Sequence, residues 1–254
     1  MCRRGRLPSV SGMNELNEAV KTKNAVITGA SRGLGLALAR GLAAAGWSLV
    51  IDARDASALH SAAASLPGTG RVIPLPGDIA DPAHRAALRD ASDDLGGPDL
   101  LINNAGTLGA SPLPAIADYP IGELRETFEI NVLAPIALTQ LLLPGLRARG
   151  GAVLSITSDA AVEPYAGWGG YGAAKAALEQ ASNVLAAEEN VVRVWWVDPG
   201  DMRTHMHQQA FLGEDISDRP LPDLVVPAFL RLITERLPAG RYRAAELMPT
   251  GARP

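Results

Sequence analysis

Tyr171 and Lys175 stand four residues apart in the segment YGAAK. Lys175 is the only lysine after residue 23, in a chain that contains 20 arginines, which indicates a role that arginine cannot fill. In a helix, residues i and i+4 lie on the same face. A nearby ammonium stabilises a phenolate, so we expect it to lower the tyrosine pKa from about 10 toward neutral pH. The pair predicts a general acid for ketone reduction that also serves as the base for alcohol oxidation.

A glycine-rich loop, TGASRGLG, follows the first apolar segment at residues 28–35. It leads into an alanine- and leucine-rich stretch with helical character at 34–45. Backbone N–H groups and the positive end of the helix dipole favour a pyrophosphate at such a junction. Glycine is needed because a side chain would hold the phosphates away. Leu38 occupies the last position of a strict G-x-G-x-x-G pattern, so a plain glycine turn is the alternative interpretation.

These two motifs, together with Asn103-Asn104-Ala105-Gly106, resemble the short-chain dehydrogenase/reductase family. The family carries T-G-x-x-x-G-x-G, N-N-A-G and Y-x-x-x-K motifs, and the resemblance runs from about residue 23 to residue 248. It implies a single domain that binds a nicotinamide cofactor. It also implies that the glycine loop holds this cofactor through the following residues: Gly29, Ser31, Arg32, Gly33, Leu34 and Gly35.

The same resemblance implies two further catalytic residues. The family places a serine 13 residues before its tyrosine, and position 158 is a serine, whose hydroxyl would orient the carbonyl and stabilise charge on its oxygen. Thr157 is the neighbouring alternative, but strand alternation and the family spacing both favour Ser158. Asn131 matches an asparagine that holds a water linked to the lysine; a buried amide that kinks a helix is the alternative. The predicted catalytic residues are Ser158, Tyr171, Lys175 and Asn131.

Further matches to the family predict the walls of the cofactor site. In the family, the acid at the position of Asp78 contacts the adenine ring, although an aspartate after a strand can equally form a turn. The N-N-A-G motif supports the sheet and the cofactor wall, and P-G-x-x-x-T ends on Thr204, which would bind the nicotinamide carboxamide. Besides Tyr171 and Lys175, the resemblance thus adds these cofactor-binding residues: Asp78, Ile79, Asn104, Ala105, Gly106, Pro199, Gly200 and Thr204.

The end of the second predicted strand indicates which nicotinamide cofactor is preferred. An acid there binds the ribose 2′-hydroxyl of NAD, whereas an arginine accommodates the 2′-phosphate of NADP. Asp52 suggests NAD, but the family's discriminating acid aligns with Ala53, and alternation turns Asp52 to the other face. Arg54 and Arg32 match arginines of NADP-binding members, and two guanidiniums can bind one phosphate. NADP(H) is favoured over NAD(H); two ordinary surface arginines are the other interpretation.

Short apolar segments alternate with helical patterns along the chain, as they must to position these residues. We expect strands over 24–28, 48–52, 71–75, 99–103, 151–157, 191–197 and 244–248. We expect helices over 34–45, 55–66, 82–95, 118–129, 130–148, 172–188 and 222–236, with Asp55 and Asp81 as N-caps and Pro82 in a first turn. Strands that are apolar on both faces indicate a parallel sheet covered on both sides. The predicted fold class is α/β, a Rossmann-type doubly wound parallel sheet of about seven strands.

One domain over residues 23–254 is the economical division, because no linker or internal repeat divides the chain. Residues 1–22 show no sustained periodicity, and we expect a flexible N-terminal extension there. Substrate specificity is expected in three loops, at 107–117, 159–170 and 201–223, the last of which could close as a lid. The large side chains of these loops are mostly apolar, which predicts a neutral or hydrophobic ketone or aldehyde rather than a sugar phosphate.

Composition and charge limit the other functions. The 23 basic and 27 acidic residues nearly cancel, which gives no support for a nucleic-acid partner. Cys2 is the single cysteine, so an internal disulfide and a cysteine-based zinc site are excluded. The apolar run 130–146 is interrupted and short of a membrane span, and the basic start lacks a signal peptide's apolar segment, so we expect a cytoplasmic protein. His205 and His207 lack a third ligand at a motif spacing, so no metal is predicted.

We therefore expect an NADP(H)-dependent oxidoreductase that interconverts a ketone or aldehyde and an alcohol by hydride transfer. A non-catalytic NADP-binding sensor or scaffold is the alternative, and it would tolerate loss of Tyr171 or Lys175. A lyase or epimerase is disfavoured because sugar-modifying relatives have a larger C-terminal substrate domain. The family resemblance also implies a homotetramer or homodimer built on the helices around 130–148 and 170–188.

Overall fold

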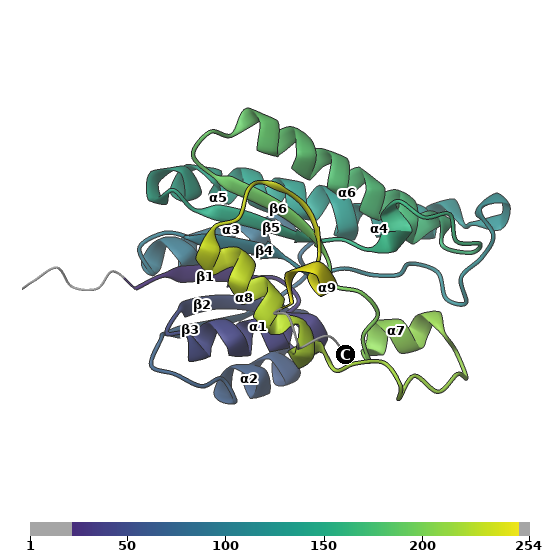
Figure 1. The fold of residues 1–254 in the computed structure, drawn as a ribbon, viewed down its shortest axis with the longest axis horizontal. Coiled ribbons are helices and arrows are strands. Elements are labelled where there is room, and N and C mark those ends of the chain that lie inside the picture. The colour runs from purple at the N-terminus through teal and green to yellow at the C-terminus, as the bar shows by residue number, and fades with distance from the viewer. Residues whose placement is uncertain (1–21, 249–254) are drawn as a thin grey trace, which may run out of the picture.

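Seven parallel strands form the centre of the protein, in the order β3-β2-β1-β4-β5-β6-β7 (Figure 1). The computed structural model describes residues 22–248. The strands are β1 (Asn24–Ile27), β2 (Ser48–Ala53), β3 (Val72–Pro76), β4 (Leu100–Asn103), β5 (Ala152–Ile156), β6 (Arg193–Asp198) and β7 (Gly240–Arg243). The predicted flexible extension and the chain end at 249–254 lie outside the described residues, so the division into an extension and one domain stays a prediction.

Helices cover both faces of this sheet (Figure 1). The α-helices are α1 (Gly33–Ala44), α2 (Ala56–Ala64), α3 (Pro82–Asp94), α4 (Ile121–Phe128), α5 (Ala134–Arg149), α6 (Gly169–Glu188), α7 (His205–Ala210), α8 (Val226–Glu235) and α9 (Ala244–Leu247). Shorter 3₁₀ turns are η1 (Ile116–Asp118), η3 (Asp159–Ala161) and η4 (Pro222–Val225), and a π-helical turn, η2 (Glu129–Leu133), joins α4 to α5. The predicted fold class, a Rossmann-type doubly wound parallel sheet, is confirmed.

Alternate residues of the central strands feed two separate hydrophobic cores. In β4, for example, Leu100 and Ile102 pack with α1 and α8, whereas Leu101 packs on the other face with α3 and α5. Successive strand side chains point to opposite faces, so strands that are covered on both sides must be apolar throughout. This explains why the strands are continuous apolar runs in the sequence.

The helix-capping predictions are confirmed at two of the helices that follow strands. The Asp55 carboxylate accepts the backbone N–H of Ala58 at 3.0 Å at the start of α2. Asp81 accepts the N–H of Ala83 at 2.9 Å, and Pro82 occupies the first turn of α3. Carboxylate caps accept hydrogen bonds from the free N–H groups of a first turn. In α2 and α3 the protein itself therefore supplies an acceptor for the first turn.

The predicted last strand over 244–248 is wrong. The strand lies earlier, at β7, where Arg241 and Tyr242 pair with Trp196 and Val197 of β6. Residues 244–247 form the short helix α9 instead. Ala244 and the leucine three positions later are both buried in the core that contains α8, a spacing that suits a helix face. The short polar strand before it offered no apolar run to detect.

The helices around residue 130 form one continuous run, Ile121–Arg149, that is long and apolar enough to span a membrane by length and composition alone. Half of its most apolar window is buried inside the protein. Leu138, Leu142 and Leu146 of α5 belong to the core between α5 and the sheet. Such burial is the normal state of a core helix in this fold, so the run is weak evidence for a membrane span.

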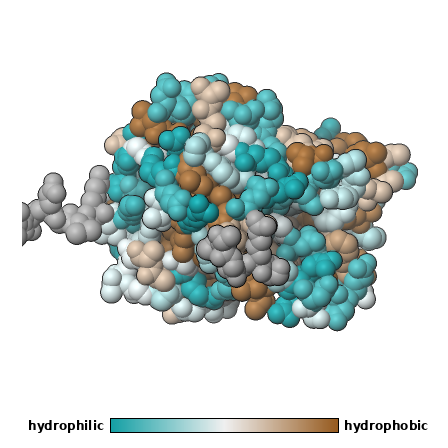
Figure 2. Space-filling view, in the orientation of Figure 1, coloured by the Kyte–Doolittle hydropathy of each residue, from teal (hydrophilic) through white to brown (hydrophobic). Residues whose placement is uncertain are grey.

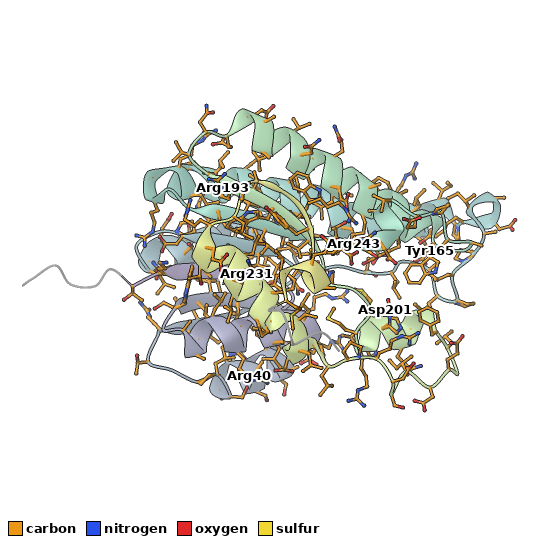
Figure 3. All side chains as sticks on the ribbon, viewed as in Figure 1. Arg40, Tyr165, Arg193, Asp201, Arg231 and Arg243 are labelled. Atoms are coloured by element: carbon orange, nitrogen blue, oxygen red, sulfur yellow. The ribbon has the colours of Figure 1, made fainter. Side chains whose placement is uncertain are left out.

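The surface in the orientation of Figure 1 is mostly hydrophilic, with hydrophobic side chains in scattered groups (Figure 2). Charged residues such as Arg40, Arg193 and Arg231 project from the helices and strand ends on this side (Figure 3). The polar side chains and loops that line a cavity lie at the carboxyl ends of the strands.

Candidate active site

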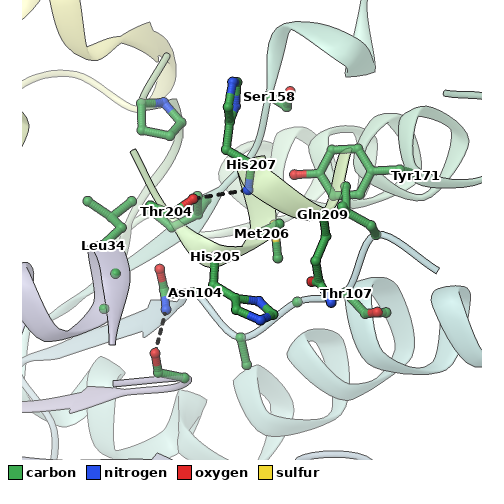
Figure 4. Close-up of a pocket in the computed structure, with 18 of the residues that line it drawn as sticks. Leu34, Asn104, Thr107, Ser158, Tyr171, Thr204, His205, Met206, His207 and Gln209 are labelled. Atoms are coloured by element: carbon green, nitrogen blue, oxygen red, sulfur yellow. Dashed lines mark hydrogen bonds between the residues drawn. The ribbon is translucent and has the colours of Figure 1, made fainter. Parts of the chain in front are cut away.

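A cavity of about 950 Å³ opens at the carboxyl ends of the central strands (Figure 4). It is bordered by the segments that follow β1, β4, β5 and β6, which is where doubly wound sheets bind ligands. Three of the predicted catalytic residues line it, namely Ser158, Tyr171 and Lys175, whereas Asn131 does not. All the predicted cofactor-binding residues line it: Gly29, Ser31, Arg32, Gly33, Leu34, Gly35, Arg54, Asp78, Ile79, Asn104, Ala105, Gly106, Tyr171, Lys175, Pro199, Gly200 and Thr204.

Tyr171 and Lys175 lie one helical turn apart on the buried side of α6. Their exposed fractions are 7% and 4%. The ammonium of Lys175 donates to the backbone carbonyl of Ile156 at 2.8 Å, and it lies 5.5 Å from the centre of the Tyr171 ring. Figure 4 shows the Tyr171 hydroxyl directed into the cavity. The helix therefore brings the two side chains together as the spacing predicts.

Burial dominates the protonation of both groups. It raises the pKa of Tyr171 above the ordinary value, and the carboxylates of Asp198 and Asp159 act in the same direction. Burial also lowers the pKa of Lys175 to about 8, partly offset by the Glu179 carboxylate. The expectation that Lys175 lowers the pKa of Tyr171 is therefore wrong for this site: desolvation of a phenolate outweighs an ammonium that is itself buried and bound to a carbonyl.

Ser158 lies two residues after the end of β5, and its hydroxyl faces a carboxylate. The hydroxyl donates to Oδ1 of Asp159 at 2.9 Å and accepts the N–H of Ala160 at 3.2 Å. The alternative, Thr157, is 2% exposed, and its hydroxyl donates to Oε1 of Glu179 at 2.8 Å. Because that hydroxyl is committed inside the protein, the geometry favours Ser158 as the group that can meet a ligand.

Asn131 is fully buried at the centre of the π-helical turn η2. Its Oδ1 accepts the N–H of Thr107 and its Nδ2 donates to the carbonyl of the same residue, both at 2.8 Å. A Cβ placed on Gly106 would lie 3.1 Å from this Oδ1 and 3.8 Å from the ammonium of Lys175, so the amide and the ammonium flank the same glycine. The amide ties the turn to the segment after β4, which agrees with the alternative interpretation of a buried, helix-distorting asparagine.

The glycine loop is fastened to its neighbours on two sides. The backbone N–H of Gly29 donates to Oδ1 of Asp52 at 2.7 Å. The Asn104 amide donates to the carbonyls of Thr28 and Gly29, at 2.8 and 3.1 Å. A Cβ on Gly35 would lie 2.4 Å from the carbonyl oxygen of Gly29, so only glycine permits this close packing of loop and helix.

The start of α1 differs from those of α2 and α3. Its N-cap residue, Arg32, makes no side-chain hydrogen bond to the first turn. Gly33 has a φ of +57°, and a Cβ there would meet only the Thr204 side chain, from 3.6 Å, within the cavity lining. The first-turn N–H groups thus face the cavity without a carboxylate cap, which suits an anionic ligand. The residues present therefore fit the pyrophosphate of a nicotinamide dinucleotide.

The carboxylate of Asp52 is committed to the protein rather than to the cavity. It is 2% exposed, and its second oxygen lies 3.2 Å from Nε2 of His84. The following residue, Ala53, carries no acid. Arg32 and Arg54 are exposed beside the cavity, and within residues 22–248 neither forms an ion pair with a carboxylate. Asp78 accepts the N–H of Ala80 at 2.9 Å, so it forms a turn as well as lining the cavity.

The predicted lid at 201–223 contains the helix α7, which the sequence did not indicate. Thr204 caps this helix by accepting the N–H of His207 at 3.2 Å (Figure 4). Phe211 at its end packs with Trp168, at 6.1 Å between ring centres, and Trp168 packs with Tyr171 at 5.8 Å. The three aromatic rings connect the lid to the proposed acid–base residue. Tyr165 and Asp201 line the cavity from the loops on its two sides (Figure 3).

Three residues of this region escaped the sequence analysis. Asp159 could have been noticed as the neighbour of Ser158, and Glu179 as the residue four positions after Lys175, where side chains of one helix face meet. Arg241 contacts both the serine carbonyl and Glu179 from β7, 83 residues after the serine in the chain. No local pattern connects such distant segments.

Comparison with known protein families gives a direct result. The family model described as short chain dehydrogenase matches residues 23–215. The chain belongs to this family. The family binds nicotinamide cofactors, and the cavity of this member fits one at the uncapped start of α1.

Relatives and solved structures agree with this membership. An oxidoreductase from Mycobacterium tuberculosis is 36% identical over 193 residues, which cover 73% of this chain and 55% of the relative. Sepiapterin reductase from Bos taurus is 37% identical over 203 residues, or 73% of this chain and 74% of the relative. Thus this family member spans only about half the length of the mycobacterial relative.

Two solved structures resemble the fold over most of their length. A short chain dehydrogenase from Pseudomonas syringae has a TM-score of 0.82 and 28% identity, covering 87% of this chain and 94% of the other. An alcohol dehydrogenase from Thermococcus sibiricus, complexed with 5-hydroxy-NADP, has a TM-score of 0.79 and 27% identity, covering 87% and 95%. The fold of this family member is therefore shared over nearly the whole described chain.

Proposed function

We propose that the chain is an NADP(H)-dependent oxidoreductase that interconverts a ketone or aldehyde and an alcohol. Tyr171 acts as general acid in reduction and as general base in oxidation. The observation that carries this proposal is the presence of Tyr171, Lys175 and Ser158 in the same cavity as the uncapped start of α1. When bound, the nicotinamide cofactor supplies the hydride for reduction or accepts it in oxidation.

Tyr171 is suited to give a proton. Its raised pKa keeps the phenol protonated at neutral pH, so the hydroxyl can donate to the oxygen of a carbonyl as negative charge develops there. The phenolate left behind in a buried site needs a counter-charge, and the ammonium of Lys175 lies on the same helix face for that purpose. The protonation states near neutral pH therefore suit Tyr171 to act as the acid in reduction.

Ser158 orients the substrate by a change of hydrogen-bond partner. A serine hydroxyl has one proton to donate, and here it donates to Asp159. A carbonyl oxygen that enters the cavity replaces Asp159 as the acceptor of the hydrogen bond from the serine hydroxyl, while the N–H of Ala160 still donates to the serine oxygen. The serine then holds the carbonyl and stabilises charge on its oxygen during reduction.

Asn131 supports this arrangement from behind. Its two hydrogen bonds fix the Thr107 backbone next to Gly106, and the same amide oxygen lies beside the glycine that Lys175 flanks. In the family a water at this position links the asparagine to the lysine. We propose the same link here, as a route that returns a proton to Lys175 and Tyr171 from the solvent side.

Several contacts support NADP(H) over NAD(H). The Asp52 carboxylate is held by Gly29 and His84, so this acid of β2 is not available to the ribose 2′-hydroxyl. Arg32 and Arg54 line the same cavity and can together bind a 2′-phosphate. The Thermococcus alcohol dehydrogenase, whose structure was solved with 5-hydroxy-NADP, is similar to this chain over nearly its full length.

The proposed substrate is a neutral or hydrophobic carbonyl compound rather than a phosphorylated one. All three predicted substrate loops contribute apolar or aromatic side chains to the cavity: Leu108, Tyr165, Trp168, Met202, Met206 and Phe211. The carboxylates of Asp159 and Asp201 line it as well, and negative charge there repels a substrate phosphate. Two relatives are named sepiapterin reductase and 1-deoxy-11-beta-hydroxypentalenate dehydrogenase, and neither name contains a phosphate.

A non-catalytic NADP-binding sensor or scaffold remains the second candidate, with the same cavity but no use for Tyr171 and Lys175. The retention of both, buried and facing the cavity, favours the enzyme. A homodimer or homotetramer built on α5 and α6, and a location in the cytoplasm, stay predictions from the sequence.

A panel of aldehydes and ketones with NADPH, and of alcohols with NADP, tests the proposal through the nicotinamide absorbance. The expected result is turnover of neutral or hydrophobic carbonyls with NADPH. Cofactor binding without turnover of any member of a broad panel would favour the sensor or scaffold, and turnover of phosphorylated carbonyls alone would overturn the substrate class.

A further inference from the structure

Arg241 reaches the proposed active site from β7, at the edge of the sheet. Its Nε donates to Oε1 of Glu179 at 2.9 Å, and its Nη2 donates to the backbone carbonyl of Ser158 at 3.2 Å. The same Nη2 lies 3.9 Å from a carboxylate oxygen of Asp198. The arginine side chain is 24% exposed and that of Glu179 is 12% exposed, so the pair is largely shielded from solvent. A rigid guanidinium with two directed hydrogen bonds fixes the distance between strand and helix.

The segment that it holds is the end of β5 and the serine after it. Glu179 belongs to the same helical stripe of α6 as Tyr171 and Lys175, because each is four residues from the next. Three successive residues are then held by three successive charged side chains: the Ile156 carbonyl by Lys175, the Thr157 hydroxyl by Glu179, and the Ser158 carbonyl by Arg241. Of these three side chains, Arg241 is the one that contacts the backbone of the serine itself.

Charge alternates along the same three side chains. Lys175 and Arg241 are cationic, and the carboxylate of Glu179 lies between them and raises the pKa of Lys175 against burial. The other charged or titratable groups on the elements packed around this part of α6 are Tyr171 on α6, Asp159 on η3, Asp198 on β6, Tyr242 and Arg243 on β7, Glu129 on η2, and the exposed Glu123, Arg125 and Glu126 on α4. Of these, Asp159 and Asp198 act on Tyr171.

We propose that Arg241 is a positioning residue of this active site, which places Ser158 through its backbone carbonyl and sets the charge of Lys175 through Glu179. This inference rests on the proposed function. Loss of the arginine frees the serine carbonyl and leaves the Glu179 carboxylate without its cation, so Glu179 acts more strongly on Lys175. Loss of the Glu179 carboxylate has the opposite effect on the ammonium, although it breaks the same ion pair.

The scarcity of lysine makes a direct measurement of Lys175 practical. The chain has three lysines, so protein labelled with ¹³C-lysine gives three side-chain signals in an NMR pH titration, and Lys175→Met identifies the relevant one. Arg241→Gln is expected to raise the pKa of Lys175 by about half a pH unit or more, and Glu179→Gln to lower it by a similar amount. Arg243→Gln, which removes an exposed arginine of the same strand, is the matched control and leaves the titration unchanged.

The kinetic arm separates placement from charge. Arg241→Lys keeps the cation but loses the planar fork, and it adds a fourth lysine signal, which is assigned by comparison with the parent. We expect the Lys175 titration of the parent together with a kcat about tenfold lower and a nearly unchanged KM for NADPH. Thermal unfolding of each variant checks that it folds. If Arg241→Gln and Glu179→Gln shift the titration in the same direction or not at all, and Arg241→Lys keeps the parent kcat, Arg241 is only a structural tie and the inference is overturned. The titration needs neither cofactor nor substrate, so it can be measured even in a protein without activity. A parent protein without activity would refute the proposed function and leave the titration result to decide the role of Arg241 on Lys175.

Discussion

The carboxylate of Asp52 at the end of β2 accepts the backbone N–H of Gly29 at 2.7 Å, so the end of β2 holds the loop that follows the neighbouring strand β1. Its other oxygen lies 3.2 Å from the ring of His84 on α3. A buried carboxylate with two donors is committed to the protein. The contact connects the shape of the glycine loop with the proposed choice of cofactor, because the acid cannot also serve a ribose.

Asp52→Ala should weaken cofactor binding before it affects chemistry. The Gly29 N–H and His84 both lose their acceptor, and a buried donor without a partner costs about 1–3 kcal/mol in the free energy of unfolding. We expect a KM for NADPH raised about tenfold with a kcat within about threefold of the parent. Asp81→Ala, which removes the exposed cap of α3 and lies outside the cavity lining, is the control and should leave the KM for NADPH unchanged. An unchanged KM in Asp52→Ala would show that the loop holds its shape without this contact.

The two arginines at the cavity edge should carry the preference for NADP(H). In Arg54→Ala and Arg32→Ala, kcat/KM with NADPH should fall about tenfold or more, since each loses a charge-assisted bond to the 2′-phosphate, while kcat/KM with NADH changes little. Arg125→Ala, on the exposed side of α4, controls for loss of a surface cation. Equal losses with both cofactors would assign these arginines to the shared pyrophosphate, and a parent that prefers NADH would reject NADP(H) outright.

The buried ammonium of Lys175 should lower the free energy of unfolding near neutral pH. Its pKa is about 8 in the folded state and 10.5 as the ordinary value, so the unfolded state binds more protons between these values and stability rises with pH in that window. Lys175→Met removes the cost of a buried ammonium and should raise the free energy of unfolding by about 2 kcal/mol near pH 7, with most of this difference gone near pH 10.5. Urea unfolding at the two pH values measures it. A variant that is less stable than the parent at pH 7 would contradict the stated cost.

The pH dependence of reduction should report the same group. Below pH 8 Lys175 is charged and Tyr171 is protonated, so kcat/KM with NADPH should be flat there and fall as pH rises through about 8. The raised pKa of Tyr171 keeps that group out of this range. A profile still flat at pH 9.5 would mean that the charge of Lys175 is not needed for the reaction.

Local chemistry predicted most of this fold, whereas the resemblance to the family supplied most of the predicted residues that line the cavity. Asp55 and Asp81 were readable as caps because a carboxylate before a helix has a fixed partner in the first turn. Tyr171 and Lys175 were readable because helical spacing alone sets their common face. The glycine loop is similarly local, since its turn and the start of α1 are adjacent in the chain.

The sequence failed where tertiary contacts decide. The raised pKa of Tyr171 depends on burial and on Asp198 and Asp159, which come from other elements. The edge strand β7 escaped because its polar residues have no apolar period, and its Arg241 meets Ser158 only when the sheet has formed. The helix α7 was not predicted because it has only 6 residues within a long loop, and its start is fixed by the Thr204 cap.

Tyr171→Phe tests the central claim most directly, because it removes one hydroxyl and keeps the ring against Trp168. With the best carbonyl of the panel, NADPH oxidation should fall by about 10²–10⁴-fold, the range for a lost acid–base group, while NADPH affinity by fluorescence titration stays within about twofold. Tyr242→Phe removes a hydroxyl that donates to the carbonyl of Pro238 and does not line the cavity, so this control should keep most of the activity. If Tyr171→Phe binds NADPH normally and reduces the carbonyl at the parent rate, Tyr171 is not the acid and the account is wrong.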